Sequence, residues 1–486
     1  LPFRIRDRES DFRRIDDALR ETATPTTSPI RHAPPTQAPK NDTTSPGRGQ
    51  LMKLRKTSKL SSDVFGISPT IHSESYVDRG KLDTRMGMLL TRDLHIALKA
   101  PSKAGKTWLR KRVLNNPIEV QCRVDQGVDD IYTSALSALD IKLEIRRTES
   151  NSFSGFAEAS GEVGVALLSK VRGSANGAIA REEITEHRSL KHDVNNLEFI
   201  GACITESGRR LVIEDFHYLT KKQRELFAFE LKALWELGVY VIVVGVWEET
   251  NYLLSLNHDL AAKVEEVSIK WDDDDLEQIM LLGGRALNVR FSDDVTQEIT
   301  QLSYKSAGIL QALTLKTLDA AGIYETQDKL TTIDNIELVR AAANEHAAQI
   351  SSIYENFANK VAKGIRQRKN STGIYAYTMA AIMSHEDAAL MSGVSTHAIY
   401  DLAHARQSRI NLANMRNILG KLELLHTDKE GRGLIIQYSE DDDTVSVVDH
   451  QLLLYRRFRK SPWPWDTIIA DIERCSEDDA GYESDD

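Results

Sequence analysis

One short unit near residue 100 constrains the fold more than any other part of the chain. Residues 93–100 (DLHIALKA) form an apolar run that fits a buried parallel strand, and a helical pattern begins at Thr107. The loop between them reads APSKAGKT, which matches G-x-x-x-x-G-K-[ST] except that Ala100 replaces the first glycine. Because such a loop aims backbone N–H groups at one anion from a helix N-terminus, the segment predicts a phosphate-binding loop.

The residue types of this loop fit a nucleoside triphosphate with Mg²⁺. Lys106 would reach the β- and γ-phosphates, and the Thr107 hydroxyl would ligate the metal, so we expect ATP and Mg²⁺ as cofactors. The alternative is an ordinary glycine turn before a helix, and the replacement at Ala100 affects only the loop entrance. The expected nucleotide-binding residues of this segment are Ala100, Pro101, Ser102, Lys103, Ala104, Gly105, Lys106, Thr107 and Trp108.

A second apolar run, 209–215 (RRLVIED), ends in two acids, Glu214 and Asp215. Beside a Mg²⁺-nucleotide, one carboxylate would hold the metal through water, while the other would activate the attacking water. We assign the metal to Glu214 and the water to Asp215. The exchanged roles and a helix N-cap at Asp215 are the alternatives. His217 follows on the loop, where packing or hydrogen bonding is its expected role.

A third apolar run, 239–246 (VYVIVVGV), is followed by a polar segment. In a phosphate-loop fold, the end of this strand is where a polar side chain can sense the γ-phosphate. Thr250 and Asn251 are the candidates, and a plain loop cap is the alternative.

Helical patterns at 106–115, 128–139 and 220–236 separate these strands. Such alternation predicts an α/β fold with a parallel sheet. Helical patterning then continues over 272–320 and 335–364, whereas 373–460 reads as a separate small module. The predicted domains are a disordered arm at 1–60, a P-loop core at 61–270, a helical lid with linker helices at 271–365, a C-terminal domain at 366–462, and a strap with an acidic tail at 463–486.

Composition excludes several other classes of protein. The longest apolar run, 239–247, is far shorter than the roughly 20 residues of a membrane helix, and no signal peptide is readable. Three distant cysteines (Cys122, Cys203 and Cys475) fit neither a disulfide framework nor a zinc cluster, which favours the cytoplasm. A formal net charge of -10 argues against a chain coated in basic charge, but it allows a local nucleic-acid face.

The two ends of the chain have the composition of disordered tails. Residues 22–49 are rich in Pro, Thr and Ser and cannot bury enough surface to offset chain entropy. Residues 1–60 carry 13 Lys/Arg against 7 Asp/Glu, so a phosphate-binding or tethering arm is the alternative to a solvated tail. At the other end, 471–486 is predicted to be a disordered acidic tail, while Trp463 and Trp465 are expected to strap onto the core.

The segment SESYVDRG, at 73–80, precedes the phosphate loop as the adenine-side box does in origin-recognition-like AAA+ ATPases and related STAND signalling ATPases. Together with the loop, the LVIED strand and the helices after 272, the chain resembles these families over about 70–320. The resemblance implies that Tyr76 or Val77 lines the adenine pocket and that Arg79 anchors the box. A plain polar turn is the alternative.

The chain departs from these families in its arginines. Where AAA+ proteins supply an arginine finger, only Lys263 is present, and Gly308 is not followed by the second sensor arginine. Lys263 has the charge but lacks the planar fork of arginine. Arg285 and Arg290 are possible substitutes, with solvated surface charge as their expected role. The resemblance therefore implies slow hydrolysis and a nucleotide switch.

Residues 373–460 are expected to be a winged helix, which origin-recognition-like ATPases also carry. Helices are predicted at 373–383, 396–405 and 408–425, followed by a hairpin of 433–439 and 443–449. The third helix would enter the major groove of DNA. Because 401–460 has 10 Lys/Arg against 9 Asp/Glu, DNA contact and protein contact stay equal alternatives. The candidate DNA-contacting residues are Arg409, Asn414, Arg416, Asn417 and Lys421.

These features together predict an ATP-dependent switch that binds ATP or ADP. The expected partners are DNA, a second copy of the chain, or an effector protein, and no membrane. By resemblance, such chains act in phage defence or in target selection by transposons. A replication-initiator or loader-like DNA-binding ATPase and a non-hydrolysing nucleotide-bound scaffold are the alternatives.

Overall fold

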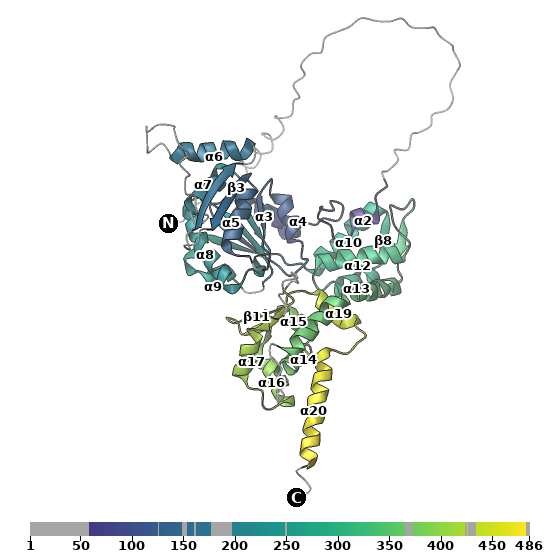
Figure 1. The fold of residues 1–486 in the computed structure, drawn as a ribbon. Coiled ribbons are helices and arrows are strands. Elements are labelled where there is room, and N and C mark those ends of the chain that lie inside the picture. The colour runs from purple at the N-terminus through teal and green to yellow at the C-terminus, as the bar shows by residue number, and fades with distance from the viewer. Residues whose placement is uncertain are drawn as a thin grey trace, which may run out of the picture. The chain divides into compact units, whose positions relative to one another are not determined.

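The computed structural model describes residues 58–124, 126–147, 153–159, 162–175, 197–247, 250–364, 373–422, 425 and 434–482 (Figure 1). The predicted arm at 1–60 lies outside the described residues, apart from Ser58, Lys59 and Leu60. None of the described helices is both long and apolar enough to cross a membrane.

A five-stranded parallel sheet organises the first half of the described chain. Its strands are β1 (His95–Lys99), β2 (Ile118–Gln121), β5 (Leu211–Glu214), β6 (Val241–Gly245) and β7 (Val264–Ser268), in the order β2-β5-β6-β1-β7. The three predicted strands are therefore β1, β5 and β6, which occupy the centre of the sheet. Because all five strands are parallel, the loops after β1, β5 and β6 leave the same edge of the sheet.

Helices cover both faces of this sheet. On one face, Ile96 and Leu98 of β1 pack with residues of α3 (Leu82–Leu90) and α4 (Lys106–Val113). On the other face, Ala97 packs with residues of three further helices. Such alternation with burial on both faces is typical of parallel sheets in α/β proteins. The three helices are α5 (Val128–Ser137), α7 (Leu197–Glu206) and α8 (Lys221–Glu236), and α9 (Tyr252–Leu256) follows β6.

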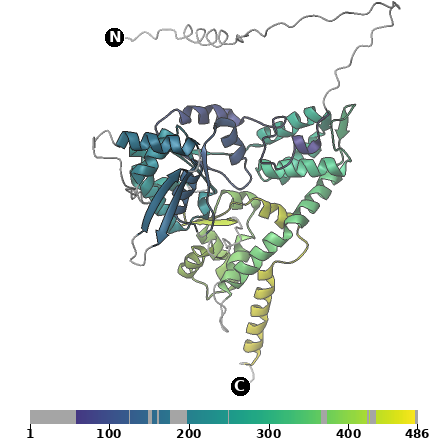
Figure 2. The same cartoon turned by 45° about the horizontal axis from the view of Figure 1, so that its top comes forward.

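A separate antiparallel pair, which the sequence did not predict, follows α5. Strands β3 (Ile141–Arg147) and β4 (Phe153–Ala159) pair along their whole length and are the two long arrows in Figure 2. The next element is α6 (Glu162–Ala175). The core thus has the predicted α/β class with an inserted hairpin.

The predicted helical region after 272 contains α10 (Asp273–Leu287), α11 (Asp293–Leu302) and α12 (Ala307–Ala320), with a short parallel pair of β8 (Val289–Phe291) and β9 (Thr331–Ile333). Side chains of Asp272, Ser292 and Ser306 cap the three helices by accepting backbone N–H groups. The short helix α2 (Ser61–Val64) also packs here, because Phe65 lies against Gly283, where an added Cβ would come within 2.2 Å of the ring.

The long helix α13 (Ile336–Lys363) leads to the C-terminal module. The elements of this module are α14 (Ile374–Ile382), α15 (Asp387–Ser392), β10 (Val394–Ser395), α16 (Thr396–Arg406), α17 (Leu412–Leu419), β11 (Ile436–Ser439), β12 (Thr444–Val447) and α19 (Gln451–Phe458). They follow the predicted order of three helices and a hairpin, with α15 and β10 in addition. The helix α17 begins later than predicted because Asn411 caps its start. The strands pair antiparallel in the order β10-β12-β11.

The predicted strap is buried as expected. Trp463 and Trp465 stack with ring centroids 4.6 Å apart and belong to the hydrophobic core. The helix α20 (Pro464–Tyr482), yellow in Figure 1, continues into the segment for which the sequence predicts a disordered tail. Only 483–486 of that tail lie outside the described residues.

Candidate functional site

The predicted phosphate loop joins β1 to α4 and lines a cavity of about 470 Å³. Lys103 and Gly105 have left-handed backbone conformations, with φ of 60° and 88°, and Gly105 immediately precedes α4. This conformation turns the chain sharply into the helix, and Gly105 adopts it without steric cost. The cavity volume lies in the range of small-molecule sites. Residues 102–108 all line the cavity.

Lys106 lies folded against its own loop. Its Nζ donates hydrogen bonds to the Ala100 carbonyl (3.1 Å) and to the Pro101 carbonyl (2.9 Å). Ala100 itself is 1% exposed and belongs to the hydrophobic core, so its methyl group packs inward and away from the cavity. This explains how the loop tolerates alanine at its first position.

The two neighbouring acids after β5 have different surroundings. Asp215 lines the cavity with a left-handed φ of 55°, and Gln121 donates a hydrogen bond to its Oδ2. Burial raises the pKa of Asp215, and the nearby charge of Lys106 opposes that shift. Glu214 does not line the cavity; it pairs with Arg110 Nε of α4 at 2.5 Å.

Arg110 explains the orientation of Glu214. Its guanidinium, 3% exposed, also makes two hydrogen bonds to Glu119, of 2.6 and 2.9 Å. Burial raises the pKa of Glu214, and Arg110 opposes that shift. The position of Glu214 therefore does not favour the metal role assigned from sequence. Asp215 is the acid that faces the cavity.

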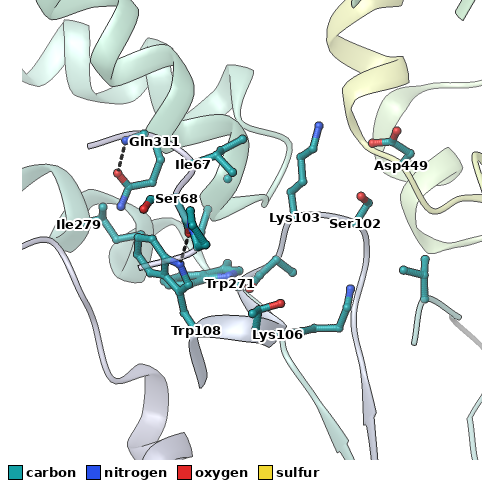
Figure 3. Close-up of a pocket in the computed structure, with 18 of the residues that line it drawn as sticks. Ile67, Ser68, Ser102, Lys103, Lys106, Trp108, Trp271, Ile279, Gln311 and Asp449 are labelled. Atoms are coloured by element: carbon teal, nitrogen blue, oxygen red, sulfur yellow. Dashed lines mark hydrogen bonds between the residues drawn. The ribbon is translucent and has the colours of Figure 1, made fainter. Parts of the chain in front are cut away.

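The adenine-side box lies on the same cavity. Tyr76, Val77 and Arg79 line it, and the Tyr76 hydroxyl donates to Asp83 Oδ1 (2.7 Å). Sequence reasoning missed further residues on this side. Ile67 and Ser68 come from the segment just before the box, whereas Trp271, Ile279 and Gln311 come from distant parts of the chain (Figure 3).

Two tryptophans shape this side of the cavity. Trp108, expected from its place in the loop, donates from its indole N–H to the Ser68 carbonyl at 2.8 Å (Figure 3). Trp271 donates to the Ala104 carbonyl at 2.9 Å, which holds the start of the lid against the phosphate loop. Flat aromatic walls of this kind fit a nucleobase.

Arg79 is a buried cation that forms no ion pair with any acid in the described part of the chain. It is 7% exposed, and its guanidinium lies 4.1 Å over the Trp271 ring. Its Nε and Nη2 have no hydrogen-bond partner in the part of the chain that the structure describes. A Cβ placed on Gly105 would lie 3.8 Å from Arg79 Nη1, so the guanidinium is next to the phosphate loop. Because buried polar groups are normally paired, Arg79 fits a ligand phosphate better than an anchoring role alone.

The lid contacts the phosphate loop through α12. The Gly308 N–H donates to the Lys103 carbonyl (2.9 Å), and an added Cβ on Gly308 would lie 2.7 Å from Lys103 Cβ. Gln311 accepts from the Gly66 N–H (3.1 Å) and donates to Ser75 Oγ (3.1 Å). The segment expected to carry a second sensor arginine therefore reaches the cavity with Gln311.

The C-terminal module also reaches the phosphate loop. The Ser102 N–H donates to the Val448 carbonyl at 3.0 Å, and Asp449 lines the cavity beside Ser102 and Lys103 (Figure 3). Burial lowers the pKa of Lys103, and the charge of Asp449 opposes that shift. Asp449 is held in turn by the Tyr354 hydroxyl at 2.7 Å. Sequence reasoning gave no signal for this contact.

The predicted sensor residues do not line the cavity. Thr250 and Asn251 are exposed, and Asn251 has a left-handed φ of 58° at the start of α9. Lys263 donates to the Asp259 carbonyl (3.0 Å) and lies 5.3 Å from the Trp235 ring. At the end of β6, Val246 lines the cavity together with His217, which follows β5.

The candidate DNA-contacting residues lie on or beside α17. All five are exposed, but Arg416 pairs with Asp443 of the hairpin turn at 2.6 Å. This pairing lowers the pKa of Asp443 to about 2. The acidic turn thus neutralises one of the candidate cations. The five residues are Arg409, Asn414, Arg416, Asn417 and Lys421.

No protein-family model and no curated protein matches the chain. Among solved structures, it is similar to Aeropyrum pernix ORC1 in complex with DNA, with 13% identity and a TM-score of 0.37 over 84% of this chain and 97% of ORC1. AMPPCP-bound DnaA from Aquifex aeolicus is 13% identical, with a TM-score of 0.31 over 73% of this chain and 91% of DnaA. A STAND protein with a tetratricopeptide repeat sensor from Pyrococcus horikoshii is 11% identical, with a TM-score of 0.33 over 84% of this chain and 45% of that protein.

The fold is assigned on the geometry of this chain. The phosphate loop joins β1 to α4, and Asp215 follows β5, which lies two strands from β1 in the sheet. The helical lid contacts the loop through α12. The sequence motifs that resemble those of AAA+ ATPases lie in these elements. The chain has an α/β fold with a parallel P-loop core and a helical lid.

Proposed function

We propose that the chain is a nucleotide-dependent switch that binds ATP or ADP with Mg²⁺ in this cavity. The observation that carries the proposal is the hydrogen bond from the Ser102 N–H to the Val448 carbonyl (3.0 Å). A phosphate loop binds its ligand with such backbone N–H groups. Nucleotide and the C-terminal module therefore contact the same loop, so the state of one biases the position of the other.

The residues present fit a Mg²⁺-nucleotide. The loop N–H groups, Lys106 and the unmatched Arg79 would hold the phosphates, while the Thr107 hydroxyl and Asp215 would hold the metal. Bound Mg²⁺ would neutralise charge that develops on the phosphates. In hydrolysis, Asp215 would orient the attacking water. Tyr76, Val77, Trp108 and Trp271 would hold the base.

The surroundings of Asp449 support a switch between two states. This carboxylate lines the cavity near Lys103, so it opposes additional negative charge there. ATP brings one more charged phosphate than ADP does. ADP is therefore compatible with the present contact, whereas ATP favours withdrawal of the segment that contains Val448 and Asp449. The released module would engage DNA, a second copy of the chain, or an effector protein, as in phage defence or transposon targeting.

Slow turnover follows from the groups that surround the phosphates. Lys263 lies away from the cavity, Gln311 occupies the lid position where an arginine would act, and Glu214 is bound to Arg110. A positive group from a second copy of the chain would complete such a site. Assembly and hydrolysis would then depend on each other.

The test is nucleotide binding and Mg²⁺-dependent turnover, with and without duplex DNA. We expect Lys106→Ala to weaken ATP binding by about 100-fold, and Asp215→Asn to abolish turnover while ATP still binds. Lys222→Ala, an exposed lysine on α8, is the control. Turnover that rises with DNA would support the DNA-coupled switch, and absence of any nucleotide binding would refute the proposal.

A non-hydrolysing scaffold is the second candidate. It is favoured by the pairing of Glu214 with Arg110, which leaves Asp215 as the acid that faces the cavity. ATP that binds through Lys106 without turnover, at any protein concentration and with or without DNA, would establish this function in place of the hydrolysing switch.

A further inference from the structure

His217 lies at the phosphate end of the cavity, one turn after β5. It is 8% exposed and lines the cavity together with Lys106 and Asp215. Its Nδ1 accepts a hydrogen bond from the Val246 N–H, at the end of β6, at 3.3 Å. The ring is thus held between two strand ends that border the site.

This hydrogen bond determines the proton position on the ring. A neutral imidazole has one donor and one acceptor nitrogen, so an accepting Nδ1 leaves the hydrogen on Nε2. The ring therefore presents its Nε2–H as a donor, and it lines the cavity together with Lys106 and Asp215.

His95 shows what a purely structural histidine looks like in the same sheet. It also accepts a β6 N–H at Nδ1, from Val241 at 3.0 Å, but its Nε2 donates to the Leu231 carbonyl at 2.9 Å. Both nitrogens of His95 are used, and it does not line the cavity at the phosphate loop. His217 makes the matching bond at the other end of β6, but its ring makes no second hydrogen bond within the described residues, and it does line that cavity.

We propose that His217 Nε2–H donates a hydrogen bond to the γ-phosphate of bound ATP and thereby distinguishes ATP from ADP. The inference rests on the proposed function, because it requires nucleotide in this cavity. The γ-phosphate is the part concerned because His217 shares its end of the cavity with Lys106 and Asp215, whereas Tyr76 and Val77 lie with the base-side residues. A hydrogen bond to the γ-phosphate adds affinity for ATP that ADP, which lacks this phosphate, does not gain. Thr250 and Asn251, the sensors expected from sequence, do not line the cavity.

The test is the affinity of the full chain for ADP and for a non-hydrolysable ATP analogue, both with Mg²⁺. We expect His217→Phe to weaken binding of the analogue by about 10-fold and binding of ADP by less than about 2-fold. His217→Gln keeps a donor and should recover part of the loss. His258→Phe, the same change at an exposed position, should alter neither affinity.

The outcomes separate this inference from the proposed function. If His217→Phe binds ADP normally but has lost affinity for the analogue, the inference stands, and the ADP affinity shows that the variant is folded. Equal losses for both nucleotides in His217→Gln, or an unchanged analogue affinity in His217→Phe, would overturn it. If the unaltered chain bound neither nucleotide, the proposed function would fail first.

Discussion

The two ends of the parallel sheet use the same kinds of side chain in opposite ways. At the amino ends of the strands, Arg210 donates to the carbonyls of Leu90 (2.8 Å), Tyr240 (3.2 Å) and Leu94. At the carboxyl ends, next to the phosphate loop, Nε and Nη2 of the buried Arg79 have no hydrogen-bond partner among the described residues. The histidines differ in the same way, since His95 uses both ring nitrogens and His217 uses one.

This difference separates stability from ligand binding. Satisfied polar groups lower the free energy of the folded chain, whereas unsatisfied buried groups cost free energy unless a ligand pairs with them. In open α/β sheets, ligands bind outside the carboxyl ends of the strands. The amino end should therefore determine the stability of the free chain, and the carboxyl end should determine nucleotide affinity.

Glu214 is the exception that tests this division, because it lies at the carboxyl end but forms an ion pair with Arg110. Breaking its buried pair with Arg110 by Glu214→Gln should cost about 3 kcal/mol in the free energy of unfolding. Chemical denaturation without nucleotide measures this. Asp215→Asn, at the next residue, is the matched control and should cost less than about 1 kcal/mol, because Asp215 lines the cavity. Equal costs for the two variants would contradict the division.

The sequence predicted the central strands but not the edges of the sheet. Runs 93–100, 209–215 and 239–246 are apolar because β1, β5 and β6 are buried on both faces. The edge strands β2 and β7 read IEVQ and VEEVS, whose alternating or charged residues reflect exposure on one side. A short run with mixed polarity does not distinguish an edge strand from a loop.

The candidate site was predictable only where it is local in sequence. A strand, a loop and a helix follow one another in 93–111, so the phosphate loop could be recognised. Trp271, Gln311 and Asp449 reach the cavity through the packing of the lid and the C-terminal module, which no spacing reveals. The sequence also did not show which of the two adjacent acids, Glu214 and Asp215, faces the cavity. Only the contact with Arg110 shows that Glu214 turns away from the cavity.

The two arginines give the next largest contrast. Arg79→Met should weaken ADP and ATP binding by about 30-fold, because the phosphates lose a buried cation, while stability without nucleotide stays equal or rises. Arg210→Met should do the reverse, with nucleotide affinity nearly unchanged and stability lower by about 2 kcal/mol. Calorimetric titration and chemical denaturation of both variants provide the measurements. A loss of stability in Arg79→Met would show that its guanidinium is already satisfied in the free chain.

His95 makes the amino end sensitive to acid. Burial lowers its pKa to about 4 from the usual 6.5 of a histidine, and Arg210 contributes to that shift. Between these values the unfolded chain binds a proton that the folded chain does not, so stability falls as the pH falls from 6.5 towards 4. For this residue the loss is about 2 kcal/mol at pH 5.

The pH slope of unfolding isolates this contribution from those of other titrating groups. His95→Gln lowers stability at neutral pH but should reduce the slope between pH 6.5 and 5 by about one proton relative to the unaltered chain. His258→Phe, at an exposed site, should leave the slope unchanged. An unaltered slope in His95→Gln would mean that His95 is not the group that takes up the proton.

Asp449 should give the smallest effect and tests the carboxyl end from the side of the C-terminal module. Its carboxylate lines the cavity near Lys103, so Asp449→Asn should strengthen ATP binding by about 5-fold and ADP binding by less than about 2-fold. The asparagine keeps an oxygen that can accept from the Tyr354 hydroxyl, so the segment should stay in place. Asp441→Asn in the hairpin turn is the matched control, because Asp441 does not line the cavity. Since the effect is electrostatic, it should shrink as salt rises. A parallel increase for both nucleotides would mean that Asp449 opposes phosphate in general, and that the C-terminal module does not discriminate between ATP and ADP.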